Sequence, residues 1–330
     1  MTKAIRIHEH GGPEVLKWED VEVGDPGPGE VLVRHTAIGL NFVDTYHRTG
    51  QMKHPVTLPM ILGVQGVGVV EALGSDAGSL PDAGGLKEGD RVSYSGLQGS
   101  YAEARLAPAE RMIVLPDDIS DELAAAAFLR ALTAEYLLRR LHRIEPGETI
   151  LVHAAAGGAG QIICQWAKAL GAVVIGTVGT DEKAELIKGL GVDHAIVYTR
   201  DDFADKVMEI TGGEGVPVVY DSVGRDTFMG SLDCLQPMGH AINYGTASGQ
   251  VEPFALQNLH KKSLTVTRPT LATYIASRED LEKASDTVFG VLRDGTVKVE
   301  ITARYALADT ARAHADLESR DTTGAMILLP

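Results

Sequence analysis

The sequence predicts an α/β protein in which a β-rich region precedes a doubly wound parallel sheet. From residue 149 to residue 244, short apolar runs typical of strands alternate with segments of helical periodicity, as the βαβ units of such a sheet require. A glycine-rich turn stands at the start of this alternation. Residues 1 to about 120 contain many glycines, prolines and short β-branched runs, which are typical of a compact, partly barrel-like β domain. A chain of 330 residues is long for one core, so we expect two domains.

The glycine-rich turn lies between Thr149 and Leu170. A β-branched run that ends at Val152 suits a buried parallel strand, and apolar residues recur at helical spacing from Ile162 onward. The junction contains Gly157, Gly158 and Gly160. Glycines here make the tight turn, let the backbone approach a pyrophosphate and let the helix pack on the strand, and the amides at the helix start attract phosphate. The stretch HAAAGGAG has alanine at the first glycine position of GxGxxG, so a turn that only closes a βα unit stays open as an alternative.

The elements after this turn follow at regular spacing. Further strands are predicted over Ala172 to Thr177, Ala195 to Tyr198, Val216 to Asp221 and His240 to Tyr244. The helical segments between them are Glu182 to Gly189, Phe203 to Ile210 and Arg225 to Leu235. Ser263 to Thr267 is expected as the edge strand of the same sheet. Two copies of such an edge can pair with each other, so the sequence predicts a homodimer.

The flanking regions contain the remaining elements. Strand-like runs of the first region are Ala4 to Ile7, Glu30 to His35, Gly63 to Val70 and Asp90 to Tyr94. A long helix is predicted over Asp121 to Leu141, with Ser120 as its N-cap and acidic residues in its first turn. Helices over Ser277 to Arg293 and Ala308 to Glu318 precede a last run, Ala325 to Leu329, which we expect to return to the first domain.

Composition limits the classes of function. Hydrophobic residues make up 44% and charged residues 23% of the chain, as in ordinary folded proteins. The N-terminus has no apolar signal region and no segment approaches the ~18 apolar residues of a membrane span, so we expect a cytoplasmic protein. A net charge of −15 disfavours nucleic acid and membrane surfaces as partners. Cys164 and Cys234 lie in helical, apolar patterns, so neither a disulfide nor a cysteine metal site is expected.

The end of the second predicted strand indicates which dinucleotide binds. Sites that prefer NAD have an acidic residue there, which binds the ribose 2′-hydroxyl, whereas NADP sites offer a cation. This strand ends at Gly179 and Thr180 without a carboxylate, and Lys183 follows within one turn. Lys183 could neutralise a 2′-phosphate, and Tyr198 at the next strand end could cover the adenine. A solvated surface lysine is the alternative, and the neighbouring acidic residues complicate the charge, so NADPH is favoured.

Several long stretches also resemble one family. They are HEHGGPEVL (8 to 16), AIGLNFVDTYHRTG (37 to 50), HAAAGGAG with CQWAKALGA (153 to 172), IGTVGT (175 to 180), YDSVGRDTF (220 to 228) and VTRPT (266 to 270). In this order, over essentially the whole chain, they resemble the zinc-free quinone oxidoreductases of the medium-chain dehydrogenase/reductase superfamily. The turn AAAGGAG is close to the AAAGGVG form that these enzymes use in place of GxGxxG.

The resemblance implies a GroES-like catalytic domain over residues 1–125, completed by 271–330, and a Rossmann NADPH-binding domain over 126–270. It places Asn41, Phe42, Val43, Asp44, Thr133 and Tyr136 near the nicotinamide. Gly158 and Ala159, with Gly157 and Gly160, would meet the pyrophosphate, and Gly179, Thr180, Lys183, Tyr198 and Arg320 would surround the 2′-phosphate. The remainder of the cofactor would be lined by Val223, Tyr244, Gly245, Thr246, Ala247, Pro269, Thr270 and Leu271.

No metal site is predicted. Matching the motifs of the related zinc alcohol dehydrogenases places Asn41, Val64 and Leu129 at the catalytic ligand positions, and these do not form a zinc ligand set. Without a Lewis acid, alkoxide chemistry loses several kcal/mol of charge stabilisation. A quinone needs less help, because its product anion is delocalised, and the protein mainly has to hold the acceptor against the nicotinamide.

The predicted catalytic residues are Asn41, Asp44 and Tyr46. Tyr46 is the best candidate for a hydroxyl that orients or protonates the acceptor oxygen, with a plain wall residue as its alternative, and Asn41 could donate its amide to that oxygen. The resulting hypothesis is an NADPH-dependent quinone oxidoreductase. Two alternatives stay open: a reductase of C=C bonds in enones or alkenals, and a non-catalytic NADPH-binding redox sensor, as related crystallins suggest.

Overall fold

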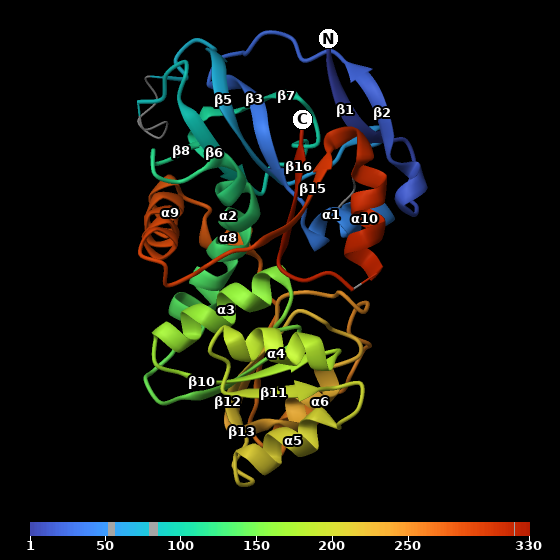
Figure 1. The fold of residues 1–330 in the computed structure, drawn as a ribbon, viewed down its shortest axis with the longest axis vertical. Coiled ribbons are helices and arrows are strands. Elements are labelled where there is room, and N and C mark those ends of the chain that lie inside the picture. Colours follow the sequence, from blue (N-terminus) through green and yellow to red (C-terminus); the bar gives the residue numbers. More distant parts are fainter. Residues whose placement is uncertain (52–56, 79–84, 320) are drawn as a thin grey trace. The chain divides into compact units, whose positions relative to one another are not determined.

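The computed structural model describes residues 1–51, 57–78, 85–319 and 321–330 and divides the chain into two compact units. Unit 1 comprises Met1–Leu132, Ile275–Arg293 and Val299–Pro330, and unit 2 comprises Thr133–Tyr274 and Asp294–Lys298 (Figure 1). The chain leaves unit 1 within α2 (Asp121–Tyr136). Among the described residues, no helix combines the length and the apolar character that crossing a membrane would require.

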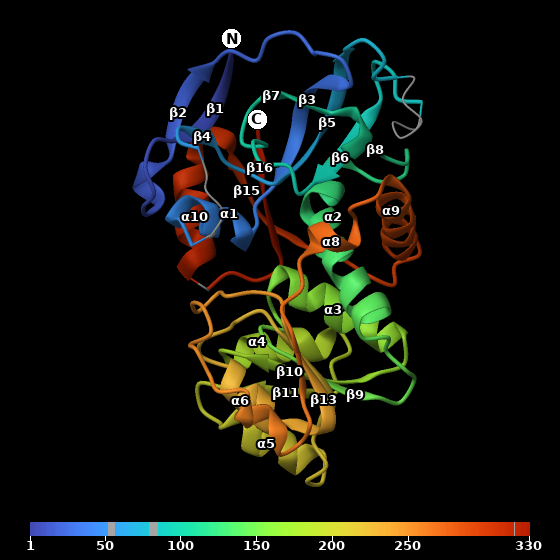
Figure 2. The same cartoon turned by 180° about the vertical axis from the view of Figure 1, so that it is seen from behind.

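Unit 1 is built on two sheets. The larger has the order β15-β16-β3-β5-β6-β8, with β7 paired to β3, and the smaller has the order β2-β1-β4. The strands of the larger sheet are β3 (Glu30–Gly39), β5 (Gln65–Leu73), β6 (Arg91–Ser95), β7 (Ala104–Pro108), β8 (Ile113–Val114), β15 (Ile301–Ala306) and β16 (Ala325–Leu329). Those of the smaller are β1 (Thr2–Ile7), β2 (Lys17–Val21) and β4 (Met60–Ile61). The predicted return of the C-terminal run is confirmed, since β16 pairs antiparallel with β3 (Figure 2).

The helices of unit 1 lie at the ends and edges of these sheets. They are α1 (Phe42–Thr49), most of α2, α9 (Arg278–Arg293) and α10 (Thr310–Ser319), with single turns η1 (Pro13–Val15), η3 (Ala109–Arg111) and η5 (Leu307–Asp309). One core cluster joins β1, the end of β3, β16 and α10 through Ile5, Ile38 and Leu328. This cluster fixes α1 and α10 to the same part of unit 1, although about 270 residues separate them in sequence.

Unit 2 is a parallel sheet in the strand order of doubly wound nucleotide-binding folds, β11-β10-β9-β12-β13-β14. Its strands are β9 (Thr149–Val152), β10 (Val173–Val178), β11 (His194–Val197), β12 (Val216–Asp221), β13 (Leu235–Asn243) and β14 (Thr265–Thr267). All five pairings are parallel, and β14 forms one edge. The predicted Rossmann arrangement and its edge strand are therefore confirmed.

The helices of unit 2 connect these strands. They are α3 (Gly158–Ala169), α4 (Asp181–Gly189), α5 (Phe203–Ile210), α6 (Phe228–Asp233), α7 (Gln257–His260) and α8 (Leu271–Tyr274). The helix expected from residue 225 is shorter than predicted. Residues 225–227 form a loop instead, because the Arg225 N–H donates to the Gly249 carbonyl at 3.1 Å and the Asp226 N–H donates to the Ser248 hydroxyl at 3.0 Å. The Asp221 carboxylate holds the start of this loop by accepting the N–H groups of Val223 and Gly224. The long helix ends as α2 at Tyr136 and continues as a π-helical turn, η4 (Leu137–Leu141).

Candidate functional site

The turn between β9 and α3 has no room for side chains where the sequence has glycine. A Cβ added to Gly160 would lie 2.2 Å from the carbonyl oxygen of Ala154, whose own φ of +50° is in the left-handed region. Ala155 stands at the first glycine position of GxGxxG. Its methyl group has room because residue 176 of β10 is a glycine: a Cβ on Gly176 would lie only 2.9 Å from that methyl group. The chain therefore passes through a tight, strained turn directly before the helix.

This turn fits a phosphate group. Gly157 is the N-cap of α3, and the helix begins at Gly158. The N–H groups in the first turn of a helix lack partners within the helix, and the helix dipole adds partial positive charge there. Because Gly157, Gly158 and Gly160 have no side chains, a ligand can approach these amides directly, as a pyrophosphate requires.

The residues after β10 form a second group. Thr180 caps α4 by accepting the N–H of Lys183, and a Cβ on Gly179 would lie 3.3 Å from the Tyr198 hydroxyl. The side chain of Tyr198 is 45% exposed. Arg200, two residues further on, donates to the Asp181 carboxylate at 3.0 and 3.2 Å. The predicted set of Gly179, Thr180, Lys183 and Tyr198 is thus brought together, and Arg200 offsets the nearby Asp181 charge.

Buried polar residues hold the loops at the carboxyl ends of the next strands. Asp221, at the end of β12, accepts the Thr227 hydroxyl at 2.9 Å as well as the two loop N–H groups. His153, at the end of β9, bonds Thr177 at 2.9 Å and Ser231 at 3.0 Å. Burial lowers the pKa of His153, while Asp221 opposes this shift. This network fixes the loop that contains Val223.

The predicted Tyr244 to Ala247 segment lies against this loop. Ala247 donates its N–H to the Ser222 carbonyl at 3.1 Å, and a Cβ on Gly245 would lie 2.5 Å from the same oxygen. Tyr136 stacks on Tyr274, with ring centroids 4.3 Å apart, and its pKa is raised chiefly by burial. Pro269, Thr270 and Leu271 follow β14, and Leu271 begins α8. Thr133 stands one turn before Tyr136 on α2.

In unit 1, the start of α1 collects the predicted nicotinamide-side residues. Asn41 is the N-cap and Asp44 lies in the first turn. The fully buried Asp44 carboxylate accepts the N–H of Asn41 at 2.9 Å, the N–H of Val64 at 3.1 Å and the Tyr101 hydroxyl at 2.9 Å. Burial raises the pKa of Asp44 to about 7, although these three donors and the Arg130 charge lower it. Phe42, Val43 and Tyr46 are half-buried on the other face of the helix.

Asn41 presents an oxygen rather than a hydrogen to its surroundings. Its Nδ2 donates to Gln65 Oε1 at 3.0 Å and to the Gly39 carbonyl at 3.3 Å. Gln65 is oriented in turn, since its Nε2 donates to the carbonyls of residues 124 and 125. Asn41 Oδ1 is buried and has no hydrogen-bond partner within the described residues. The expected donation from the Asn41 amide to an acceptor oxygen therefore has no spare hydrogen here, and the geometry favours acceptance.

One predicted residue, Arg320, lies outside the described residues. The other predicted positions fall into two groups. Asn41 to Asp44 and Tyr46 belong to unit 1, and the remainder, from Thr133 to Leu271, belong to unit 2.

Comparison with known proteins accounts for the whole chain. Residues 27–117 match the family described as alcohol dehydrogenase GroES-like domain, and residues 158–289 match the zinc-binding dehydrogenases. The chain is 48% identical to a quinone oxidoreductase of Pseudomonas aeruginosa over 100% of both chains. The chain belongs to the quinone oxidoreductases of the medium-chain dehydrogenase/reductase superfamily.

Other members of the family and its neighbours are also similar over their full length. The solved Escherichia coli quinone oxidoreductase complexed with NADPH is 46% identical, with a TM-score of 0.94, and the match covers 99% of this chain and 100% of that one. A 2-haloacrylate reductase of a Burkholderia species is 43% identical over 100% of this chain and 99% of that protein. Proteins similar to this chain over their full length are thus named both for quinones and for 2-haloacrylate.

The positions at which the zinc alcohol dehydrogenases have ligands are occupied by other kinds of side chain in this chain. Asn41 uses its amide nitrogen internally, and Val64 is a buried apolar side chain. Within the described ranges, no three His, Cys, Asp or Glu side chains are grouped so that they could hold a metal ion.

Four residues that lie beside predicted positions, two in each unit, were not themselves predicted: Gln65 and Tyr101 in unit 1, and Arg200 and Asp221 in unit 2. Asp221 and Arg200 had a signal, because each stands at or just after the end of a predicted strand. Gln65 and Tyr101 had none, since Tyr101 meets Asp44 across 57 positions of sequence.

Proposed function

We propose that the chain is an NADPH-dependent quinone oxidoreductase that acts without zinc. The observation that supports this most strongly is the side-chain-free turn at Gly157 to Gly160, which suits a pyrophosphate, followed by a second strand end with Lys183 and Arg200. Relatives of nearly half-identical sequence are named quinone oxidoreductases, and one was solved with NADPH.

In this proposal, residues 126–270 form the NADPH-binding domain, and residues 1–125 with 271–330 form the catalytic domain. The glycine turn holds the pyrophosphate, and Lys183, Tyr198 and Arg200, together with Arg320, hold the 2′-phosphate end. Val223, Tyr244 to Ala247 and Pro269 to Leu271 line the remainder, with Thr133 and Tyr136 toward the nicotinamide. NADPH, when bound, supplies a hydride.

The residues of α1 orient the reactants. Asn41 Oδ1, buried and without a partner among the described residues, accepts a hydrogen bond from an N–H or O–H group of a bound molecule. Tyr46 is half-buried on the open face of α1 and is the candidate proton source. Asp44, whose carboxylate accepts from three donors, holds the start of the helix and acts on the reactants through Asn41. A quinone suits this arrangement, because its reduced oxygen is stabilised by its own ring.

A second candidate activity is the reduction of activated C=C bonds. It is favoured by the 43% identical 2-haloacrylate reductase, whose solved structure matches with a TM-score of 0.86. The same residues would serve, because a conjugated acceptor also delocalises its charge.

One experiment separates these functions. NADPH oxidation is measured with a small quinone, with an enone and with 2-chloroacrylate, each with NADH in parallel. We expect turnover with the quinone and NADPH. A strong preference for the enone or the haloacrylate would identify a C=C reductase instead. Tight NADPH binding without turnover on any acceptor would indicate a sensor.

We also propose that the protein is a cytoplasmic homodimer that pairs through β14. This strand has one neighbour, β13, and its other edge is unpaired within the described sheet. Thr265, Val266 and Thr267 are exposed or half-buried there. Pairing of two copies would satisfy both edges.

A further inference from the structure

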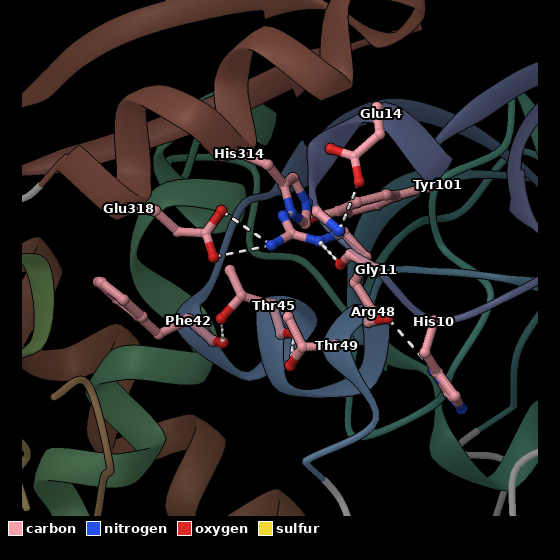
Figure 3. Close-up of polar contacts among 11 residues, drawn as sticks. His10, Gly11, Glu14, Phe42, Thr45, Arg48, Thr49, Tyr101, His314 and Glu318 are labelled. Atoms are coloured by element: carbon pink, nitrogen blue, oxygen red, sulfur yellow. Dashed lines mark hydrogen bonds and ion pairs between the residues drawn. The ribbon is translucent and has the colours of Figure 1, made fainter. Parts of the chain in front are cut away.

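A buried arginine in the last turn of α1 binds three groups (Figure 3). Arg48 is 1% exposed. It donates to the Gly11 carbonyl at 3.0 Å, to His314 Nδ1 at 2.8 Å and to the Glu318 carboxylate at 2.7 and 2.9 Å. Glu318 compensates its charge, and both His314 and Glu318 belong to α10. The guanidinium is held so that one donor points at the His314 ring.

This contact determines which ring nitrogen of His314 has the hydrogen. A guanidinium has donors only, so His314 Nδ1 must accept and cannot be protonated. The pKa of His314 is lowered to about 3 by burial and by the Arg48 charge, so the ring is neutral. The single hydrogen of a neutral ring is then on Nε2. This nitrogen lies 3.1 Å from the Tyr101 hydroxyl oxygen, to which it donates.

The Tyr101 hydrogen is directed in turn. With its oxygen accepting from His314, the Tyr101 hydroxyl donates to Asp44 Oδ2 at 2.9 Å. The same Oδ2 accepts the Asn41 N–H. The hydrogen bonds therefore all point in one direction: Arg48 donates to His314, His314 donates to Tyr101, and Tyr101 donates to Asp44. The charged and titratable groups that face Asp44 are Tyr101 from the loop before β7 and Arg130 from α2, with Arg48 and His314 behind Tyr101.

We propose that Arg48 and His314 are positioning residues: they set the direction in which the Tyr101 hydroxyl donates, and so keep this donor on the Asp44 oxygen that also accepts the Asn41 N–H. This inference rests on the proposed function in that it places Asn41 beside the reactants. Without Arg48, the His314 hydrogen could move to Nδ1. Tyr101 would then donate to Nε2, and Asp44 would lose one donor while remaining buried.

The first test needs neither cofactor nor turnover. In protein labelled with 15N-histidine, long-range NMR spectra report which nitrogen of each ring is protonated, and His314→Gln identifies the His314 signals. We expect neutral His314 with hydrogen on Nε2 at pH 7 in the wild-type chain, and partial or full Nδ1–H in Arg48→Met. A wild-type Nδ1–H tautomer, or an unchanged tautomer in Arg48→Met, would overturn the proposal.

The second test measures the pH dependence of kcat/KM for the quinone. Arg48→Met and Tyr101→Phe should each shift the acid limb upward by about one pH unit, because Asp44 loses a donor to its charged form. In the double variant the shift should equal that of Tyr101→Phe alone. Additive shifts would overturn the proposal, since Arg48 would then act by another route.

A matched control distinguishes positioning from stability. Arg91 is also an arginine of unit 1, paired with Asp121 away from this cluster. Arg91→Met should lower stability without moving the acid limb, and an equal shift there would count against the proposal. If Arg48→Met does not fold, the proposal is still tested by the His314 tautomer of the wild-type chain and by the acid limb of Tyr101→Phe. If the wild type reduces no acceptor, the proposed function fails while the NMR result still tests the relay.

Discussion

Ala154 and Gly160 meet at the tightest point of the turn after β9. The added Cβ of Gly160→Ala would lie 2.2 Å from a backbone oxygen that cannot move without shifting β9 or α3. We expect this change to destabilise the protein by about 1–3 kcal/mol, as overpacking does, and to weaken NADPH binding. Urea unfolding and calorimetry measure the two effects.

Gly157→Ala is the matched control for this change. Its Cβ would lie 3.3 Å from the same oxygen, and its φ of −75° suits any residue. The stability loss should be under about 1 kcal/mol. Equal losses at 157 and 160 would contradict the steric explanation.

Lys183 is the side chain that should distinguish NADPH from NADH. Lys183→Ala removes a cation from the first turn of α4, beside Thr180 and Tyr198. We expect the Kd for NADPH to rise about tenfold, the value of one charge-assisted contact, and the Kd for NADH to stay nearly constant. Lys188→Ala, on the same helix but paired with Glu185, should change neither constant. Equal weakening of both dinucleotides by Lys183→Ala would exclude a 2′-phosphate role.

At the scale of elements, the sequence predicted those strands and helices whose bounds are set by residues near in sequence. The strand Val216–Asp221, the helix Phe203–Ile210 and the strand Ala325–Leu329 agree with their predicted bounds, because each is a clear apolar pattern between turn signals. The helix α1 was missed, since its eight residues include few apolar ones. Its signals were the N-cap Asn41 and Gly50, whose φ of +74° ends the helix.

In the candidate site, likewise, only the groups formed by residues near in sequence could be predicted. The glycine turn and the basic second strand end follow from residues that are near in sequence. The surroundings of Asp44 do not, because Arg48 and Glu318 are 270 positions apart and meet only when α10 packs beside α1. The orientation of Asn41 likewise depends on Gln65, whose amide is fixed by carbonyls of α2.

The edge strand β14 is the element that tests the dimer. A charge at an exposed edge position opposes pairing of two identical strands, because the two copies bring like charges together. Thr265→Asp should therefore convert the dimer to a monomer, measured by light scattering after size exclusion. His194→Asp, at the exposed start of the opposite edge strand β11, should leave the mass unchanged. A monomeric wild type would refute the dimer itself.

At the scale of the whole molecule, each unit has its own buried polar network. In unit 1 it comprises Arg48, His314, Tyr101 and Asp44, and in unit 2 it comprises His153, Asp221 and their hydroxyl partners. Both networks enclose a histidine that burial keeps neutral. Protonation of these rings is therefore linked to unfolding, and the stability of the protein should depend on pH.

Acid should destabilise the protein between about pH 6.5 and pH 4. Burial lowers the pKa of His35 to about 4 and that of His314 to about 3, from an ordinary 6.5, so in this window the unfolded chain binds protons that the folded chain excludes. Asp44 acts with the opposite sign, because its pKa is raised to about 7 from 3.8 and the folded chain keeps a proton that the unfolded chain releases. The effect of the two histidines exceeds that of the one aspartate, so the free energy of unfolding should fall by on the order of 3 kcal/mol across this window.

Urea unfolding at pH 7, 6, 5 and 4 measures this loss. His35→Gln should reduce the slope of the unfolding free energy against pH by close to one proton, because the titrating ring is gone. His8→Gln, at an imidazole that is 53% exposed, should leave the slope as it is. If His314→Gln left the slope as it is in the wild type, the His314 ring would take up a proton in the folded state as it does in the unfolded chain. In that case Arg48 would not hold His314 in a single protonation form, because a ring that binds a second hydrogen has no acceptor left for the guanidinium.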